Sequence, residues 1–86
     1  MQIEASRRRR TWTETDRGML VLVKLVMADD WSAGRAAAQL VRLIRDPRVL
    51  GRLTVRVRAA QSDRPSEFGE RAEQTLLRAE AQLGAA

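Results

Sequence analysis

The sequence predicts an all-α protein: three helices form a core, a fourth helix follows, and a basic segment precedes them. Three observations support this prediction. Apolar residues recur at helical spacing in four stretches, residues with helix-capping side chains precede three of these stretches, and prolines stand in the last two connections. The corresponding division of the chain is a flexible basic arm at 1–11, a core at 12–61, and a loop with the C-terminal helix at 62–86.

The composition limits the chain to one small domain. Its 86 residues are 44% hydrophobic and 31% charged, which argues against disorder over most of the length. No cysteine is present, so stability must come from packing or self-association. The longest apolar run, 19–28, is about half of a membrane span, and its flanks do not resemble a secretory signal. We therefore expect a cytoplasmic protein with no membrane partner.

The first helix is expected at about 14–28. Thr13 is a suitable N-cap, and Asp16 stands at the capping-box position three residues later. The interior of this stretch is apolar nearly all round, which suits the central helix of a small bundle. Its three valines leave a buried strand near 19–27 as an alternative.

The second helix is expected at about 32–45, where the amphipathic pattern is clearest. Asp29, Asp30 and Ser32 all offer caps for its first turn. Polar side chains recur at spacings of four and three residues on one face, and apolar side chains fill the other. The apolar set is Ala36, Ala37, Leu40, Val41 and Ile44.

The third helix is expected at about 47–61, because Asp46 can cap it and Pro47 fits its first position. At 100° per residue, one face carries the apolar side chains Val49, Leu50, Leu53, Val57 and Ala60. The opposite face carries Arg48, Arg52, Arg56 and Arg58. Apolar and polar residues also alternate in this stretch, so a strand near 52–58 is the alternative. Together with a strand near 19–27 it would give a small α/β fold.

The fourth helix is expected at about 66–83, with Gly84 as its terminator. One stripe joins Phe68, Ala72, Leu76, Ala79 and Leu83, and Glu67 and Arg71 form a helix-supporting i,i+4 pair. This helix is acidic on balance. We expect it to face away from any polyanion, either capping the core or forming a homodimer through residues 66–83.

Positive charge is concentrated in two parts of the chain. The net charge of +5 is divided into +3 in residues 1–12 and +6 in residues 31–62, while residues 13–30 and 63–86 each carry −2. A basic arm combined with a basic central segment is the expected footprint of a polyanionic partner.

The run from Arg7 to Glu14, followed by Leu20, Leu22, Asp30-Trp31-Ser32 and Ala36-Ala37, resembles Myb/SANT-type helix-turn-helix domains. The segment 32–52 is also similar to bacterial helix-turn-helix proteins that open with a Trp-Thr pair. The resemblance covers about residues 7–61. It implies a helix-turn-helix core in which spaced tryptophans pack together and the third helix enters the major groove. The chain departs from the pattern in having no third tryptophan, so Leu50 or Leu53 would take that place.

The candidate DNA-binding residues are mainly arginines. Arg48, Arg52 and Arg56 would face the groove, where a guanidinium can bridge O6 and N7 of guanine, and Val55 could contact a thymine methyl. Arg7, Arg8, Arg9 and Arg10 would follow phosphates or enter the minor groove. Weaker phosphate contacts are expected from Lys24, Arg35, Arg42 and Arg58. Trp12 and Trp31 are interpreted as core anchors with their N–H groups near the surface.

The sequence therefore predicts a protein that binds double-stranded DNA, either as a regulator or as a DNA-organising factor of a high-GC bacterium or its phage. Such a protein would be associated with the nucleoid. The alternative is a helical adaptor that binds an acidic protein partner. An enzyme is not expected, because the chain has neither histidine nor cysteine and no Gly-rich phosphate loop. No cofactor or metal is expected either.

Overall fold

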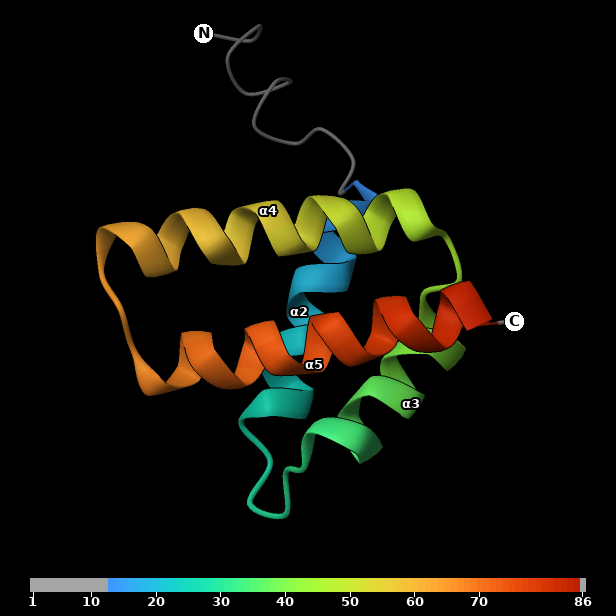
Figure 1. The fold of residues 1–86 in the computed structure, drawn as a ribbon, viewed down its shortest axis with the longest axis horizontal. Helices are drawn as coiled ribbons and strands as arrows, with labels where there is room; N and C mark the ends of the chain where they lie inside the picture. The colour runs from blue at the N-terminus through green and yellow to red at the C-terminus, as the bar shows by residue number, and fades with distance from the viewer. Residues whose placement is uncertain (1–12, 86) are drawn as a thin grey trace, which may run out of the picture.

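The computed structural model describes residues 13–85 and contains four helices, shown in Figure 1. They are α2 (Glu14–Val26), α3 (Ala33–Leu43), α4 (Pro47–Asp63) and α5 (Glu67–Ala85). The all-α prediction is confirmed for this part of the chain. The α/β alternative is wrong, because residues 19–26 and 52–58 are helical and no strand occurs in the described residues.

Local capping signals start three of the helices where the sequence places them. The Thr13 hydroxyl accepts a hydrogen bond from the backbone N–H of Asp16 at 3.1 Å, and the Asp16 carboxylate accepts one from the N–H of Thr13 at 3.2 Å. This confirms the predicted capping box at the start of α2. Ser32 caps α3 and Asp46 caps α4, with Pro47 in the first turn of α4.

The helix ends were predicted less accurately than the starts. α2 ends at Val26 instead of residue 28, and α4 continues to Asp63 instead of residue 61. Gly84 does not terminate α5, which extends through it to Ala85. A terminating glycine adopts a left-handed conformation with positive φ, and no described glycine has a positive φ.

α5 lies at the centre of the packing. α4 and α5 form an antiparallel pair, α2 crosses behind them, and α3 packs against α5 (Figure 1). The backbones of α3 and α4 do not approach each other closely, whereas α5 contacts both helices. The central helix is therefore α5 and not the first helix, as the apolar character of 14–28 had suggested. In α2, Leu20 and the adjoining Met27 are largely exposed.

Small side chains explain why α5 takes this place. Ala72, Thr75 and Ala79 are fully buried, at spacings of three and four residues along α5. Such short side chains let neighbouring helices approach on both sides. The hydrophobic core consequently crosses the boundary expected at residue 61.

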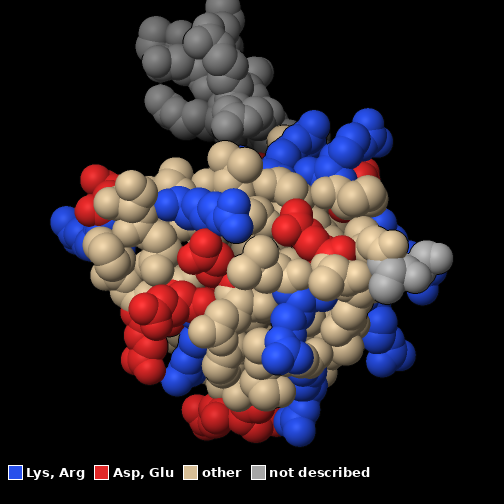
Figure 2. Space-filling model, viewed as in Figure 1, with Lys and Arg blue, Asp and Glu red and all other residues tan. Residues whose placement is uncertain are grey.

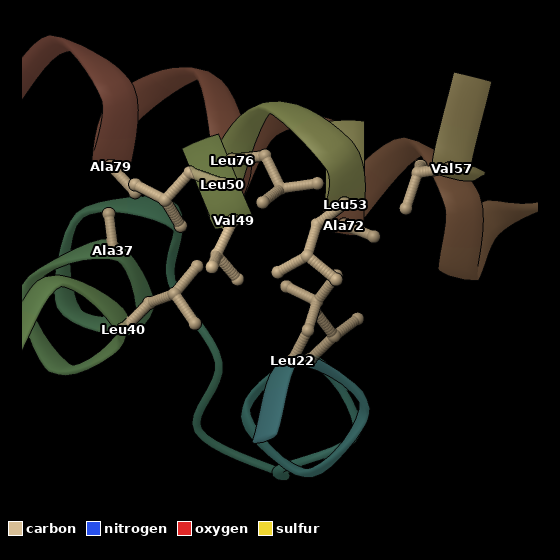
Figure 3. Close-up of a cluster of buried hydrophobic side chains, with 11 residues drawn as sticks. Leu22, Ala37, Leu40, Val49, Leu50, Leu53, Val57, Ala72, Leu76 and Ala79 are labelled. Carbon is tan, nitrogen blue, oxygen red and sulfur yellow. The ribbon is translucent and has the colours of Figure 1, made fainter. Parts of the chain in front are cut away.

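All four helices contribute side chains to this core, and Figure 3 shows those side chains pointing toward one another. The predicted apolar faces of α3, α4 and α5 are buried or half-buried, with Ala60 as the exception because it is exposed. The fully enclosed or nearly enclosed residues are Leu22, Val26, Ala37, Leu40, Val49, Leu50, Leu53, Val57, Ala72, Leu76 and Ala79.

Trp31 attaches the connection between α2 and α3 to α5. Its indole packs against the core, as expected from the sequence, and its Nε1–H donates to the Thr75 hydroxyl at 3.1 Å. The Thr75 hydroxyl in turn donates to the Arg71 carbonyl at 2.8 Å. The Arg71 guanidinium lies over the indole, 5.1 Å from the ring centroid. Trp12, the other predicted anchor, lies outside the described residues.

If α5 is part of the core, two neighbouring leucines on it should differ sharply in their effect on stability. Leu76 is fully buried, whereas Leu77 is 47% exposed. We expect Leu76→Ala to lower the free energy of unfolding by about 2–5 kcal/mol, because it leaves a cavity. Leu77→Ala should cost less than about 1 kcal/mol. Urea unfolding followed by circular dichroism measures both, and equal small losses would show that α5 is peripheral.

Candidate nucleic-acid interface

One face of α4 carries the arginines that the sequence singled out. Val49, Leu50, Leu53 and Val57 are buried on the inner side of this helix. Their burial leaves Arg48, Arg52, Val55 and Arg56 exposed on the outer side, and we call these four residues the α4 arginine face. At a rise of 1.5 Å per residue, Arg48 and Arg56 are separated by about 12 Å along the helix axis.

The α4 arginine face lines an open depression of about 660 Å³. Gly51, on α4, and Thr15, in the first turn of α2, complete its lining. Open space surrounds Gly51, since a Cβ atom added there would meet nothing within 4 Å. The structure thus brings together four of the predicted contact residues. It adds Thr15, which sequence reasoning missed because nothing local places the start of α2 beside α4.

The guanidinium groups of this face are only loosely engaged. Arg56 Nη1 lies 3.4 Å from Asp16 Oδ1, and Arg48 Nε lies 3.5 Å from Asp46 Oδ1. Within residues 13–85, Arg52 has no carboxylate within ion-pair distance. Ion pairs that are this exposed contribute little to stability, so a phosphate can replace the carboxylate at small cost.

Asp16 and Asp46 stand at the two helix starts that border the face, and both are held in the ionised form. The backbone N–H of Thr13 lowers the pKa of Asp16 most, followed by the Thr13 hydroxyl and Arg56. The backbone N–H of Arg48 is the main cause of the lowered pKa of Asp46. Each carboxylate therefore accepts hydrogen bonds at a helix N-terminus, where negative charge is favoured.

The weaker candidates are not part of this surface. Arg58 turns toward α5, where its Nε lies 3.1 Å from Glu73 Oε2. Arg35, in the first turn of α3, forms an ion pair with Asp30, which precedes this helix. Its Nη1 lies 2.9 Å from Asp30 Oδ2. Lys24 and Arg42 are exposed on α2 and α3, and neither lines the depression beside α4.

The side of the molecule crossed by α5 has mixed charge. Figure 2 shows acidic and basic side chains interspersed on this side. Two of the arginines of this part of the structure are paired with glutamates, Arg58 with Glu73 and Arg71 with Glu67. A surface of alternating sign gives little net attraction for a polyanion, in contrast to the α4 arginine face.

Arg7, Arg8, Arg9 and Arg10 lie outside the described residues. They precede Thr13, which caps the helix whose first turn borders the depression. Arg10 is three residues from Thr13, so their Cα atoms can be at most about 11 Å apart.

No protein-family model matches this chain, and no characterised protein sequence or solved structure is significantly similar to it. Its chemistry must therefore be inferred from its own residues. In the described part of the chain, no three acidic, histidine or cysteine side chains converge as metal ligands. None of the helices in residues 13–85 is long and apolar enough to cross a membrane.

The lowered pKa values of Asp16 and Asp46 predict a loss of stability in acid. A carboxyl group whose pKa is lower in the folded state stabilises that state fully above its unfolded value, near 3.8. This contribution is lost as the pH falls through the folded pKa. The double variant Asp16→Asn, Asp46→Asn should therefore lose less stability than the original chain between pH 6 and pH 3.

Urea unfolding at the two pH values measures this difference, and asparagine preserves the cap at position 46. Asp29→Asn is the matched control, because Asp29 accepts no hydrogen bond within the described residues. An equal pH dependence of all three proteins would contradict the prediction.

Proposed function

We propose that this protein binds double-stranded DNA through the α4 arginine face, with Arg7 to Arg10 as an auxiliary arm. The observation that carries the proposal is the alignment of Arg48, Arg52 and Arg56 on one exposed helix face. The same face has Val55 among the arginines and adjoins the point where the basic segment enters the fold. Regulation or organisation of DNA, and association with a nucleoid, are the roles that such binding would serve.

The shape of α4 supports this proposal. The helix has 17 residues, or a length of about 25 Å, and it forms one edge of the molecule in Figure 1. A B-DNA major groove about 12 Å wide accepts one α-helix. Arginines at intervals of four residues can contact successive guanines or phosphates there, and the Val55 methyl groups, 68% exposed, can contact thymine.

The proposed docking differs in one respect from that implied by the Myb/SANT resemblance. In a helix-turn-helix unit the two helices of the motif pack on each other, whereas here the backbones of α3 and α4 make no close contact and each helix packs on α5. α4 is instead supported by α5 on its inner side and by the first turn of α2 at the depression. We therefore assign any neighbouring phosphate contacts to the start of α2 and the arm rather than to α3.

An acidic protein is the competing partner for the same arginines, and a comparison of two triple variants separates the alternatives. We expect Arg48→Ala, Arg52→Ala, Arg56→Ala to weaken binding to a random duplex strongly. The slope of log K against log salt should flatten by about 0.9 for each phosphate that the variant no longer neutralises. Fluorescence anisotropy across a NaCl titration measures both quantities.

The matched control is Arg35→Ala, Arg42→Ala, Arg78→Ala, which removes the same charge from α3 and α5. It should retain most of the affinity and slope. Equal losses in the two triple variants would show an effect of net charge alone. Absence of duplex binding by the original chain at low salt would remove DNA as the partner and favour the adaptor function.

The arm and the helix should make different kinds of contact. Changing Arg7 to Arg10 to alanine should weaken binding equally on all sequences and flatten the salt slope, because phosphate contacts carry no sequence information. Arg52→Ala should instead relax the preference at one base pair, by about 1–3 kcal/mol. Selection of bound oligonucleotides from a random pool measures this preference. An unchanged affinity and slope in the first variant would exclude the arm, and a uniform loss in the second would exclude groove readout.

A further inference from the structure

A second depression lies on the other side of the first turns of α2. It has a volume of about 490 Å³ and is enclosed by α2, the end of α3 and the start of α4. Its floor and walls are mainly apolar and consist of Gly18, Val21, Leu43, Ile44 and Val49, while the charged residues Glu14, Arg17, Arg45 and Asp46 complete the lining. Leu43 is 66% exposed. We call this depression the apolar groove.

We propose that Trp12 covers the apolar groove and thereby fixes the N-terminal segment to the helical bundle. Trp12 directly precedes Thr13, so their Cα atoms are about 3.8 Å apart. Thr13 caps α2, and Glu14, the next residue, already lines the groove. The indole needs no further chain to reach the apolar lining.

The capping box at the start of α2 indicates on which side of the helix the Trp12 indole would lie. In such helix starts, a hydrophobic residue before the N-cap often packs against a hydrophobic residue at the fourth helical position, an arrangement called the hydrophobic staple. Here the residue before the N-cap is Trp12. The fourth helical residue is Arg17, because Asp16 is the third. Arg17 lines the apolar groove, with Val21 one turn beyond it. Arg17 is charged, so the methylene stem of its side chain, rather than an apolar side chain, would make this contact. A contact of this kind would place the indole against the groove rather than toward Thr15 and the α4 arginine face.

The chemistry of the Trp12 side chain is complementary to that of the apolar groove. A tryptophan is a large apolar group that also attracts a cation over its ring. The groove supplies apolar carbon at Val21, Leu43 and Ile44, together with a guanidinium at Arg17. A second copy of the chain is a less suitable occupant, because a stable interface buries about 800 Å² on each partner and this groove is a small concavity.

Docking of Trp12 has a consequence for DNA binding, and this step alone rests on the proposed function. Arg10 is two residues from Trp12, so covalent geometry keeps their Cα atoms within about 7 Å of each other. A fixed indole would therefore also hold the start of the arm close to the bundle. The arm would then leave the bundle from a defined point beside α4. Loss of the anchor should weaken the contribution of the arm without changing its charge.

Nuclear Overhauser effects in the full chain test the docking directly and require no substitution. We expect contacts from the Trp12 indole protons to the methyl groups of Val21 and Leu43. The Trp31 indole, which hydrogen-bonds Thr75, is the internal reference for a docked tryptophan. Absence of contacts from Trp12 while Trp31 shows its own would overturn the proposal. Contacts that arise only between differently labelled copies would also overturn it.

Acrylamide quenching provides a second test in the Trp31→Phe background, where Trp12 is the only fluorophore of its kind. Trp12 should be protected from quenching, and Leu43→Asp should abolish that protection and shift the emission to the red. Leu77→Asp is the matched control, because Leu77 is an exposed leucine that does not line the groove.

Equal quenching with and without Leu43→Asp would contradict the docking. Circular dichroism verifies that each variant is folded, and the nuclear Overhauser test remains decisive if one is not. Both measurements are made without DNA, so a failure of Trp12 docking can be distinguished from a failure of DNA binding.

Discussion

The packing of α5 against both α3 and α4 is the interaction on which the other features of the molecule depend. Ala72, Thr75 and Ala79 allow this close approach, and Leu76 fills the space between the helices. A chain of 86 residues buries only about 60–65% of its unfolded surface, so each buried side chain of α5 carries a large share of the total stability. Trp31 depends on the same helix, because the hydroxyl that accepts its N–H belongs to Thr75.

The inner side of α4 determines the orientation of its outer side. Val49, Leu50, Leu53 and Val57 lock the rotation of the helix, since a shift by one residue would turn it by about 100° and expose them. The exposed arginines are therefore oriented before any partner arrives. A helix backbone that is already fixed lowers the ordering cost of the proposed DNA binding, compared with a charged loop.

The start of α2 connects the α4 arginine face with the apolar groove. The Asp16 carboxylate accepts from the Thr13 N–H and from Arg56 Nη1, so the cap of α2 also restrains one arginine of α4. Thr15 borders the depression beside the α4 arginine face, while Arg17 borders the apolar groove. One helical turn thus connects the basic N-terminal segment, the proposed DNA-binding face and the proposed docking place of Trp12.

Sequence alone determined the features that depend on neighbouring residues: the caps at Thr13 and Asp46, the four helices, and the opposed apolar and arginine faces of α4. For α3 the sequence offered Asp29, Asp30 and Ser32 as caps, and Ser32 is the one used. Capping and periodicity are local, so they can be read without the fold. Only the tertiary structure decided that α5 is central, that Arg58 turns to Glu73, and that Thr15 borders the depression beside the α4 arginine face. These outcomes depend on how closely distant helices approach, and side-chain size at contacts between them sets that distance.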